Sequence, residues 1–174
     1  MVGKLALLGA TGSIGTSTLA VLREQAPRIT LSLVSAHRDA QKLAAVCREF
    51  SVSTAILTGI TESSEQSSLR QAYPDMKLFF GEEELLKALR NEDYDVALNA
   101  ISGSAGLRAS FAIAEKKARL ALANKESLVM AGHLLMPLLR NNQVELLPVD
   151  SEHSAIFQAI GGHPSSEVRV IHIT

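Results

Sequence analysis

Three glycines near the start of the chain are the first residues whose spacing suggests chemistry. Gly9, Gly12 and Gly15 follow an apolar run centred on residues 5–8 and precede a helical pattern at residues 16–23. Glycine allows a sharp turn and leaves no Cβ between the backbone N–H groups and an anion. The N-terminus of the following helix favours a phosphate. The order of strand, glycine turn and helix predicts dinucleotide binding, although the spacing is G-x-x-G-x-x-G rather than the commoner G-x-G-x-x-G. The alternative is a purely structural glycine-rich turn.

A basic pair follows the second expected strand, at residues 29–34. NAD-binding sheets usually carry a carboxylate here for the ribose 2′-OH, whereas this chain has His37, Arg38 and Asp39. Arginine binds phosphate through its fork of N–H donors, and Ser35 could donate a further hydrogen bond. The pattern therefore favours NADP(H) over NAD(H). The alternative is a solvated Arg38 and an Asp39 that caps the next helix.

A run of polar residues, Asn-Lys-Glu-Ser at 124–127, joins an expected strand at residues 119–123 to an expected helix at residues 126–139. Ligands bind at the carboxyl ends of the strands in a parallel sheet, so these side chains are candidates for ligand contacts. The alternative is a structural junction that is capped by Asn124.

Two carboxylates, Asp150 and Glu152, follow a further expected strand at residues 144–149. At a helix start both could face one ion, and hard oxygen ligands of this kind suit Mg²⁺ or Mn²⁺. Alternatively, Asp150 or Ser151 caps the helix, and Glu152 is a first-turn acid that the helix dipole stabilises. His153 is either a ligand or a packed or capping residue.

Apolar segments alternate with helical patterns along the chain, which predicts an α/β fold with a doubly wound, mostly parallel, Rossmann-like sheet. Strands are expected at residues 5–8, 29–34, 54–58, 77–80, 95–101, 119–123 and 144–149. Helices are expected at residues 16–23, 39–50, 82–90, 103–117, 126–139 and 151–160, with a polar helix or exposed loop at 61–71.

The last residues, 167–173, alternate between apolar and polar side chains, as a half-buried strand does. Such a strand would suit the start of a second domain. We therefore expect an NADPH-binding domain over residues 1–150 and the beginning of a catalytic domain over residues 151–174, in a piece of a longer protein.

Composition narrows the class of protein. The 174 residues are 47% hydrophobic and 20% charged with a net charge of −1, which is ordinary for a globular protein and predicts no general attraction to nucleic acid or membrane. The lone cysteine, Cys47, excludes an intrachain disulfide and a cysteine-rich zinc site, and its helical context indicates a buried hydrophobe. The sequence has no apolar run of about 18 residues and no signal segment before the first strand, so a reducing, cytoplasmic location is expected.

Three motifs together resemble the 1-deoxy-D-xylulose 5-phosphate reductoisomerase family. They are Gly-Ala-Thr-Gly-Ser-Ile-Gly at 9–15, Leu-Ala-Asn-Lys-Glu-Ser-Leu-Val at 122–129 and Leu-Pro-Val-Asp-Ser-Glu-His at 147–153. Residues 99–106 also resemble the family's segment beside the cofactor. The first motif occurs in many dehydrogenases, whereas the second and third are specific in order and distance. The resemblance spans essentially the whole chain but only the N-terminal part of the longer family members.

The resemblance implies an NADPH-dependent enzyme that converts 1-deoxy-D-xylulose 5-phosphate to 2-C-methyl-D-erythritol 4-phosphate in non-mevalonate isoprenoid biosynthesis. It also implies Mg²⁺ or Mn²⁺, a sugar-phosphate substrate and a homodimer. Matched residue by residue, the resemblance implies that the cofactor pyrophosphate contacts Thr11, Gly12, Ser13 and Ile14. It implies that the adenosine phosphate contacts His37, Arg38 and Asp39, and that other parts of the cofactor contact Asn124 and Glu126. It also implies substrate contacts at Lys125, Ser151 and Glu152, and metal ligands at Asp150 and Glu152.

Two departures from the family pattern matter. The family often has Gly-Lys-Asn where this chain has His37, Arg38 and Asp39, so the cation is kept but Asp39 places a carboxylate beside the expected phosphate. The family's third metal carboxylate, its mobile loop and most of its substrate-phosphate ligands are expected beyond Thr174. We therefore expect this chain to bind NADPH without turning over substrate.

Other classes of protein fit less well. A semialdehyde dehydrogenase can begin with the same glycine turn but needs a nucleophilic cysteine, and Cys47 lies in the wrong kind of segment. A homoserine-dehydrogenase-like enzyme shares an Ala-Asn-Lys stretch, but the Asp-Ser-Glu-His segment does not fit it. A non-catalytic NADP(H)-binding module remains the alternative from a different class.

Overall fold

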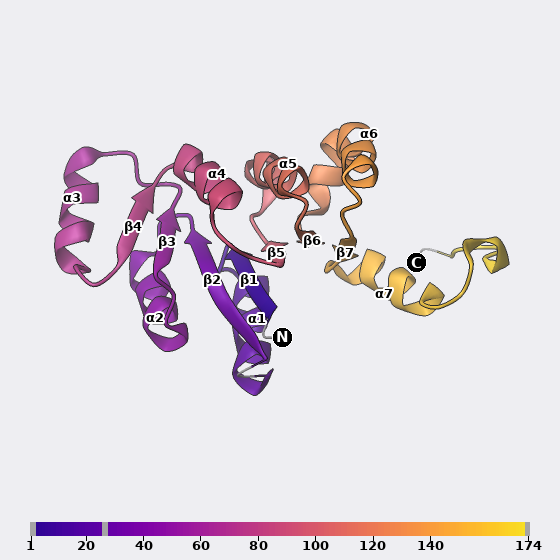
Figure 1. The fold of residues 1–174 in the computed structure, drawn as a ribbon, viewed down its shortest axis with the longest axis horizontal. Helices are drawn as coiled ribbons and strands as arrows, with labels where there is room; N and C mark the ends of the chain where they lie inside the picture. The colour runs from indigo at the N-terminus through magenta and orange to yellow at the C-terminus, as the bar shows by residue number, and fades with distance from the viewer. Residues whose placement is uncertain (1–2, 26–27, 173–174) are drawn as a thin grey trace.

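One parallel sheet forms the centre of the molecule. The computed structural model describes residues 3–25 and 28–172. Within them seven strands pair in the order β4-β3-β2-β1-β5-β6-β7 (Figure 1), and all six pairings are parallel. The strands are β1 (Gly3–Leu8), β2 (Ile29–Ala36), β3 (Thr54–Leu57), β4 (Lys77–Phe80), β5 (Val96–Asn99), β6 (Arg119–Leu122) and β7 (Leu146–Pro148).

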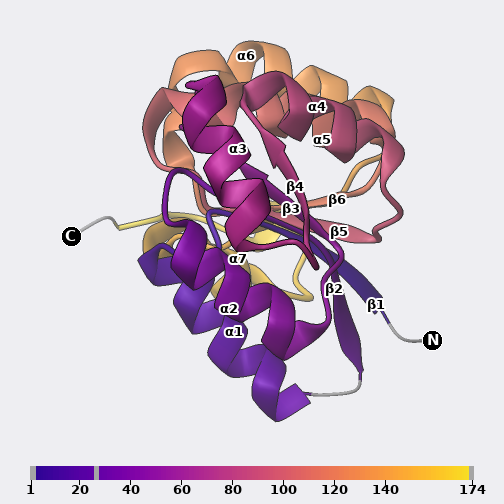
Figure 2. The same ribbon diagram turned by 90° about the vertical axis from the view of Figure 1, so that its left-hand side faces the viewer.

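Helices cover both faces of the sheet (Figure 2). One face carries α1 (Ser13–Gln25) and α2 (Ala40–Phe50), and the other carries α4 (Glu82–Asn91), α5 (Leu107–Lys116) and α6 (Lys125–Asn141). Beside the edge strand β4 lies α3 (Ser63–Ala72), and α7 (Ser151–Ile160) extends away from the sheet after β7 (Figure 1). The doubly wound α/β prediction is therefore confirmed.

The burial pattern explains why the two layers form. Strand β3 is buried along its whole length, as expected for a parallel strand that is covered on both sides. Helix α4 carries glutamates in its first turn, where the helix dipole favours them, and buries Leu85, Leu86 and Leu89 on one stripe. Each fully buried leucine stabilises the fold by about 1.5–3 kcal/mol. The two faces of the sheet thus hold separate apolar cores.

The strand order brings distant segments of the chain to one edge. Leu8, at the end of β1, pairs with Ser35 of β2 on one side and with Asn99 of β5 on the other. The order changes direction between β1 and β5, and ligands of open α/β sheets bind at such a switch point. The loops after β1, β2 and β5 are consequently neighbours.

Two predicted elements differ from the structure. The helix expected at residues 103–117 is a short 3-10 helix, η1 (Gly103–Gly106), followed by α5. Gly103 has φ of +68°, which an α-helix does not allow. The strand expected at 167–173 is wrong over the described residues: Glu167 ends the 3-10 helix η2 (Ser165–Glu167), and residues 168–172 pair with no described strand. A strand needs a partner for its backbone hydrogen bonds, and residue 173 lies outside the described residues.

Within residues 3–25 and 28–172, no helix combines the length and the apolar character that crossing a membrane requires.

Candidate functional site

The three glycines of the β1–α1 turn have different roles. Gly9 has φ of +78°, and a Cβ there would lie 2.6 Å from the carbonyl oxygen of Ala100. A Cβ at buried Gly15 would overlap the backbone of Gly9. Gly12 is exposed, and a Cβ there would meet only the Gly9 carbonyl oxygen, at 3.4 Å. Gly9 and Gly15 therefore serve the packing of the turn, whereas Gly12 leaves its surface open to a ligand.

Helix α1 directs its N-terminus at this open surface. The helix begins at Ser13, and its first turn holds no acidic side chain. Thr16 donates both its backbone N–H and its hydroxyl to the carbonyl oxygen of Gly12, at 2.9 and 2.8 Å, which holds the turn against the helix. The first N–H groups of a helix have no intrahelical partner and carry partial positive charge. The arrangement suits a phosphate.

Two cavities adjoin at the switch point. They have volumes of about 390 and 110 Å³, and both are lined by Gly12 and by residues 100–102 after β5. The larger extends over the end of β2 and is also lined by Thr11, Ser35, His37 and Thr58. The smaller extends toward β6 and is also lined by Ser13, Ile14, Asn124 and Glu126. The structure thus gathers Thr11, Gly12, Ser13, Ile14, His37, Asn124 and Glu126 along one groove.

Asn124 shapes the wall of this groove. It is buried, and its Oδ1 accepts from the backbone N–H and the hydroxyl of Ser127, both at 2.8 Å, so it caps α6. Its Nδ2 donates to the carbonyl oxygens of Ile101 and Gly103 in the segment that follows β5. The junction role offered as an alternative is confirmed, because the amide binds the protein through both its oxygen and its nitrogen.

Asn99, at the end of β5, forms hydrogen bonds that stabilise the same wall of the groove. Its Nδ2 donates to the Gly106 carbonyl oxygen at 2.8 Å and to the Ser110 hydroxyl at 2.9 Å, and its Oδ1 accepts from the N–H of Ile101. A Cβ at Gly106 would lie 2.6 Å from Nδ2 of Asn124, so glycine is required there. Within the described part of the chain every buried side-chain N or O has a hydrogen-bond partner.

The predicted residues after β2 have different roles: one lines the larger cavity, and another caps a helix. His37 lines the larger cavity, with its Nδ1 3.4 Å from the hydroxyl of Thr58. Asp39 caps α2, as its alternative role predicts: it accepts from the N–H of Lys42 at 3.0 Å, and this bond, aided by the Lys42 ammonium, outweighs burial and lowers the pKa of Asp39.

Arg38 points away from the groove toward α3. Its Nη1 donates to the Gly59 carbonyl oxygen at 2.8 Å, and its Nη2 lies 3.0 Å from both carboxylate oxygens of Glu65. It is not among the residues that line the larger cavity. Arg38 lies in the β2–α2 loop with its side chain 57% exposed, as the alternative of a solvated loop residue predicts, and its guanidinium also forms an ion pair with Glu65.

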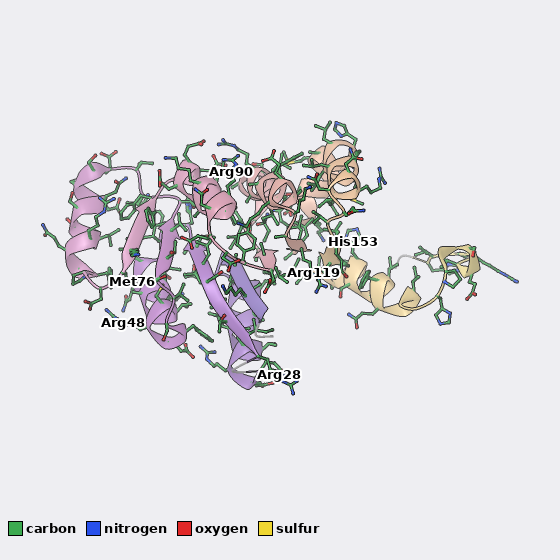
Figure 3. All side chains as sticks on the ribbon, viewed as in Figure 1. Arg28, Arg48, Met76, Arg90, Arg119 and His153 are labelled. Atoms are coloured by element: carbon green, nitrogen blue, oxygen red, sulfur yellow. The ribbon has the colours of Figure 1, made fainter. Side chains whose placement is uncertain are left out.

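Asp150 caps α7. It accepts from the His153 N–H at 3.1 Å and lies 2.8 Å from His153 Nδ1, and its side chain is 11% exposed. Burial opposes its ionisation, but the two contacts from His153 and the charge of Lys125 outweigh burial and lower the pKa of Asp150. His153 marks the start of α7 beside β7 in Figure 3.

Lys125 joins the two later motifs. Its Nζ lies 3.7 Å from Oε1 of Glu152, and Glu152 also accepts from the Ser151 hydroxyl at 2.8 Å. That hydrogen bond and the charge of Lys125 lower the pKa of Glu152, against the opposing charge of Asp150. The ends of β6 and β7 therefore bring Lys125 to Glu152 and Ser151, with Asp150 close enough for its charge to act on Glu152.

The donor set at the end of β7 fits a hard cation with few protein ligands. No group of three or more His, Cys, Asp or Glu side chains that could hold a metal occurs in residues 3–25 and 28–172. Mg²⁺, however, commonly takes one or two carboxylates and completes its shell with water and substrate oxygens. Asp150 and Glu152 are ionised and already attract the ammonium of Lys125. Their chemistry is compatible with such an ion.

An apolar cavity of about 540 Å³ borders Asp150. It lies between α7 and β7, with Leu146, Pro148, Ile156, Phe157 and Ile160 among its lining residues. Asp150 and His153 form part of its rim. Asp150 thus lines an apolar cavity, whereas Glu152 contacts Lys125.

Two residues beside the groove were not found from the sequence. Thr58 lines the larger cavity, and Glu65 binds Arg38. Both follow β3, which pairs with β2. Only the strand order places the β3–α3 segment beside Arg38. The sequence therefore provided one signal for Thr58 and Glu65, which is the general rule that loops at the carboxyl edge of a parallel sheet bind ligands.

The sheet order, the glycine turn and the groove at the switch point define a Rossmann-like dinucleotide-binding domain. The family model of 1-deoxy-D-xylulose 5-phosphate reductoisomerase matches residues 5–132. The chain belongs to this family and corresponds to its N-terminal region.

Individual relatives agree. The 1-deoxy-D-xylulose 5-phosphate reductoisomerase of Francisella tularensis subsp. novicida is 43% identical over 160 residues, which is 92% of this chain and 40% of the relative. That of Cupriavidus metallidurans is 42% identical over 167 residues, or 95% of this chain and 42% of the relative. The chain thus spans about two fifths of the length of these relatives.

Solved structures give the same answer. The Zymomonas mobilis reductoisomerase in complex with NADPH is 36% identical with a TM-score of 0.85, over 94% of this chain and 42% of that one. A reductoisomerase in complex with magnesium has a TM-score of 0.84 at 36% identity, with the same coverage. The homoserine dehydrogenase of Thermoplasma acidophilum, 19% identical with a TM-score of 0.52 over 84% of this chain and 42% of its own, shares the fold alone.

Proposed function

We propose that this chain is the NADPH-binding region of a 1-deoxy-D-xylulose 5-phosphate reductoisomerase. The observation that carries the proposal is the groove at the switch point, which joins the open N-terminus of α1 to His37 on one side and to Asn124 and Glu126 on the other. The solved relative from Zymomonas mobilis that holds NADPH supports it. In the whole protein the reaction would convert 1-deoxy-D-xylulose 5-phosphate to 2-C-methyl-D-erythritol 4-phosphate.

Each end of the groove would bind a different part of the cofactor. Residues 11–14 would hold the pyrophosphate through backbone N–H groups and the dipole of α1. Residues 37–39 would lie at the adenosine phosphate, with His37 on the cavity wall. Asn124 and Glu126, at the opposite end, would lie toward the nicotinamide. The cofactor supplies the hydride, and the chain positions it.

The acidic pair would serve the substrate. Asp150 and Glu152 would hold Mg²⁺ or Mn²⁺, and Lys125 and Ser151, which contact Glu152, would bind the sugar phosphate. When bound, such an ion polarises a carbonyl as a Lewis acid. Until substrate arrives, Lys125 limits the repulsion between the two carboxylates by its positive charge. A homodimer, a cytoplasmic location and the division into residues 1–150 and 151–174 belong to the same proposal.

Placing a negative charge at the start of α1 tests cofactor binding. Ser13 is exposed at the first position of α1, so in Ser13→Asp the carboxylate favours the helix but repels a pyrophosphate. We expect an affinity loss for NADPH of about tenfold or more, measured by fluorescence titration. Ser63→Asp is the matched control, because Ser63 is exposed at the first position of α3, outside the groove. NADPH binding by Ser13→Asp at the wild-type affinity would contradict the proposal.

Catalysis needs a separate measurement. The 174-residue chain spans about two fifths of the length of its relatives, so we expect it to bind NADPH but to oxidise it far more slowly than a full-length relative. The assay follows NADPH absorbance with 1-deoxy-D-xylulose 5-phosphate and Mg²⁺. Turnover near that of a full-length relative would refute this expectation while leaving cofactor binding intact.

A further inference from the structure

An ion pair at the end of β2 joins two loops that the sequence keeps far apart. Nη2 of Arg38 lies 3.0 Å from both Oε1 and Oε2 of Glu65, in the first turn of α3. Nη1 of the same guanidinium donates to the carbonyl oxygen of Gly59 at 2.8 Å. These contacts direct the guanidinium toward α3, and the cavity over β2 is lined by His37 rather than by Arg38.

The charges around this ion pair cancel. Arg38 faces Glu65, and Lys42 faces Asp39 with its Nζ 3.4 Å from Oδ2. Two cations and two carboxylates therefore leave no excess positive charge where a 2′-phosphate would bind. A phosphate approaching Arg38 meets a guanidinium whose fork already holds a carboxylate, and arginine binds phosphate and carboxylate through the same donors.

We propose that Glu65 is a positioning residue that sets the preference between NADPH and NADH by competing with the 2′-phosphate for Arg38. The inference rests on the proposed function, because it concerns the adenosine end of the same groove. NADH carries a hydroxyl in place of the 2′-phosphate, so its binding is indifferent to the competition. Glu65 consequently weakens NADPH binding and leaves NADH binding unchanged.

The size of the effect follows from the exposure of the pair. The side chain of Arg38 is 57% exposed and that of Glu65 is 39% exposed, so solvent screens their attraction. For an exposed pair we expect Glu65→Gln to tighten NADPH binding by about threefold to fivefold, with NADH affinity changing by less than about twofold. The effect shrinks as the salt concentration rises.

The experiment measures dissociation constants of NADPH and NADH for wild type, Glu65→Gln, Arg38→Met and the double variant. Arg38→Met is expected to weaken NADPH binding, and in its background Glu65→Gln is expected to change nothing, because Glu65 acts through Arg38. Glu62→Gln is the matched control: Glu62 precedes the same helix and is exposed, and no ion pair involving it occurs among the described residues. Circular dichroism and urea unfolding establish that each variant is folded.

Selectivity separates this inference from a structural role. A carboxylate that only anchors α3 would alter NADPH and NADH affinity together, so an unchanged ratio in Glu65→Gln overturns the inference. Weaker NADPH binding in Glu65→Gln also overturns it, because Glu65 would then prepare Arg38 for the phosphate. If wild type binds neither nucleotide, the proposed function itself fails, which is a different result from NADPH binding with an unaltered ratio.

Discussion

Gly12 and Gly15 lie about one helical turn apart, but glycine is needed at the two positions for different reasons. At Gly15 the backbone of the turn occupies the space that a side chain would need, whereas at Gly12 that space is open. A glycine can thus be kept for packing or for the approach of a ligand. Both requirements occur within one motif, and only the neighbouring atoms distinguish them.

This difference predicts opposite phenotypes for two alanine variants. Gly15→Ala is expected to lower the free energy of unfolding by about 2–3 kcal/mol, because a Cβ would overlap backbone atoms that cannot move independently. Gly12→Ala is expected to keep the stability within about 1 kcal/mol and to weaken NADPH binding. Urea unfolding and NADPH titration measure both. Equal stability of the two variants would show that the turn can relax around Gly15.

Asp39 predicts a pH dependence of stability. The N–H of Lys42 donates to its carboxylate and lowers its pKa below the ordinary value of 3.8. The bond therefore stabilises the fold above that pH, and the contribution is lost as the pH falls through the folded pKa. Asp39→Asn keeps a capping side chain that does not titrate. We expect its unfolding free energy to fall less steeply than that of wild type below pH 4, measured by urea unfolding at each pH.

At the scale of elements, the groove owes its shape to buried amides. Asn99 at the end of β5 holds η1 and α5, and Asn124 at the start of α6 holds the β5–η1 segment from the other side. These bonds cross between elements that are more than 20 residues apart in the case of Asn124. Hydrogen bonds of Asn99 and Asn124 therefore connect the wall of the groove to η1, α5 and α6.

Loss of the Asn124 amide should loosen this wall. Asn124→Ala removes the cap of α6 and leaves the part-buried carbonyl oxygens of Ile101 and Gly103 without their donor. We expect the free energy of unfolding to fall by about 2–4 kcal/mol. Asn91→Ala, at the exposed end of α4, should change it by less than about 0.5 kcal/mol. Similar losses in the two variants would show that the amide bonds contribute little to stability.

For the whole molecule, the strand order decides which loops meet. Because all the strand pairings are parallel, the segments after β1, β2, β5, β6 and β7 lie along one carboxyl edge. The groove occupies the middle of that edge, and the acidic pair stands at one end of it. The opposite, amino edge carries none of the predicted site residues.

Hydrogen exchange in the presence of NADPH should follow this division. We expect amides of residues 9–15 and 100–106 to exchange more slowly with NADPH bound, because the ligand orders the loops of the groove. Amides of residues 116–119, at the amino edge, serve as the control and should not change. Equal protection at both edges would place the cofactor elsewhere or indicate a general stiffening of the fold.

The sequence and the structure both indicate that Cys47 is a buried side chain rather than a catalytic nucleophile. It is buried in α2, and burial raises the pKa of its thiol to about 11. A thiol of that kind does not act as a nucleophile near neutral pH. The sequence context of a helix face already indicated this role, because the periodicity of apolar residues predicts which side of a helix is buried.

The sequence by itself determined the seven strands of the sheet, the winding and the glycine turn, because apolar periodicity and backbone tolerance are local properties. It also indicated the polar groups at the ends of β2, β6 and β7. Only the folded chain shows that Gly12 is open while Gly15 is packed, that Asn124 donates to Ile101 and Gly103, and that Glu65 binds Arg38. Contacts of this kind depend on which strands are neighbours. Packing, hydrogen bonds and ion pairs act between atoms that are close in space, whatever their separation along the chain. The spacing of residues in the sequence therefore could not identify the partners in these contacts.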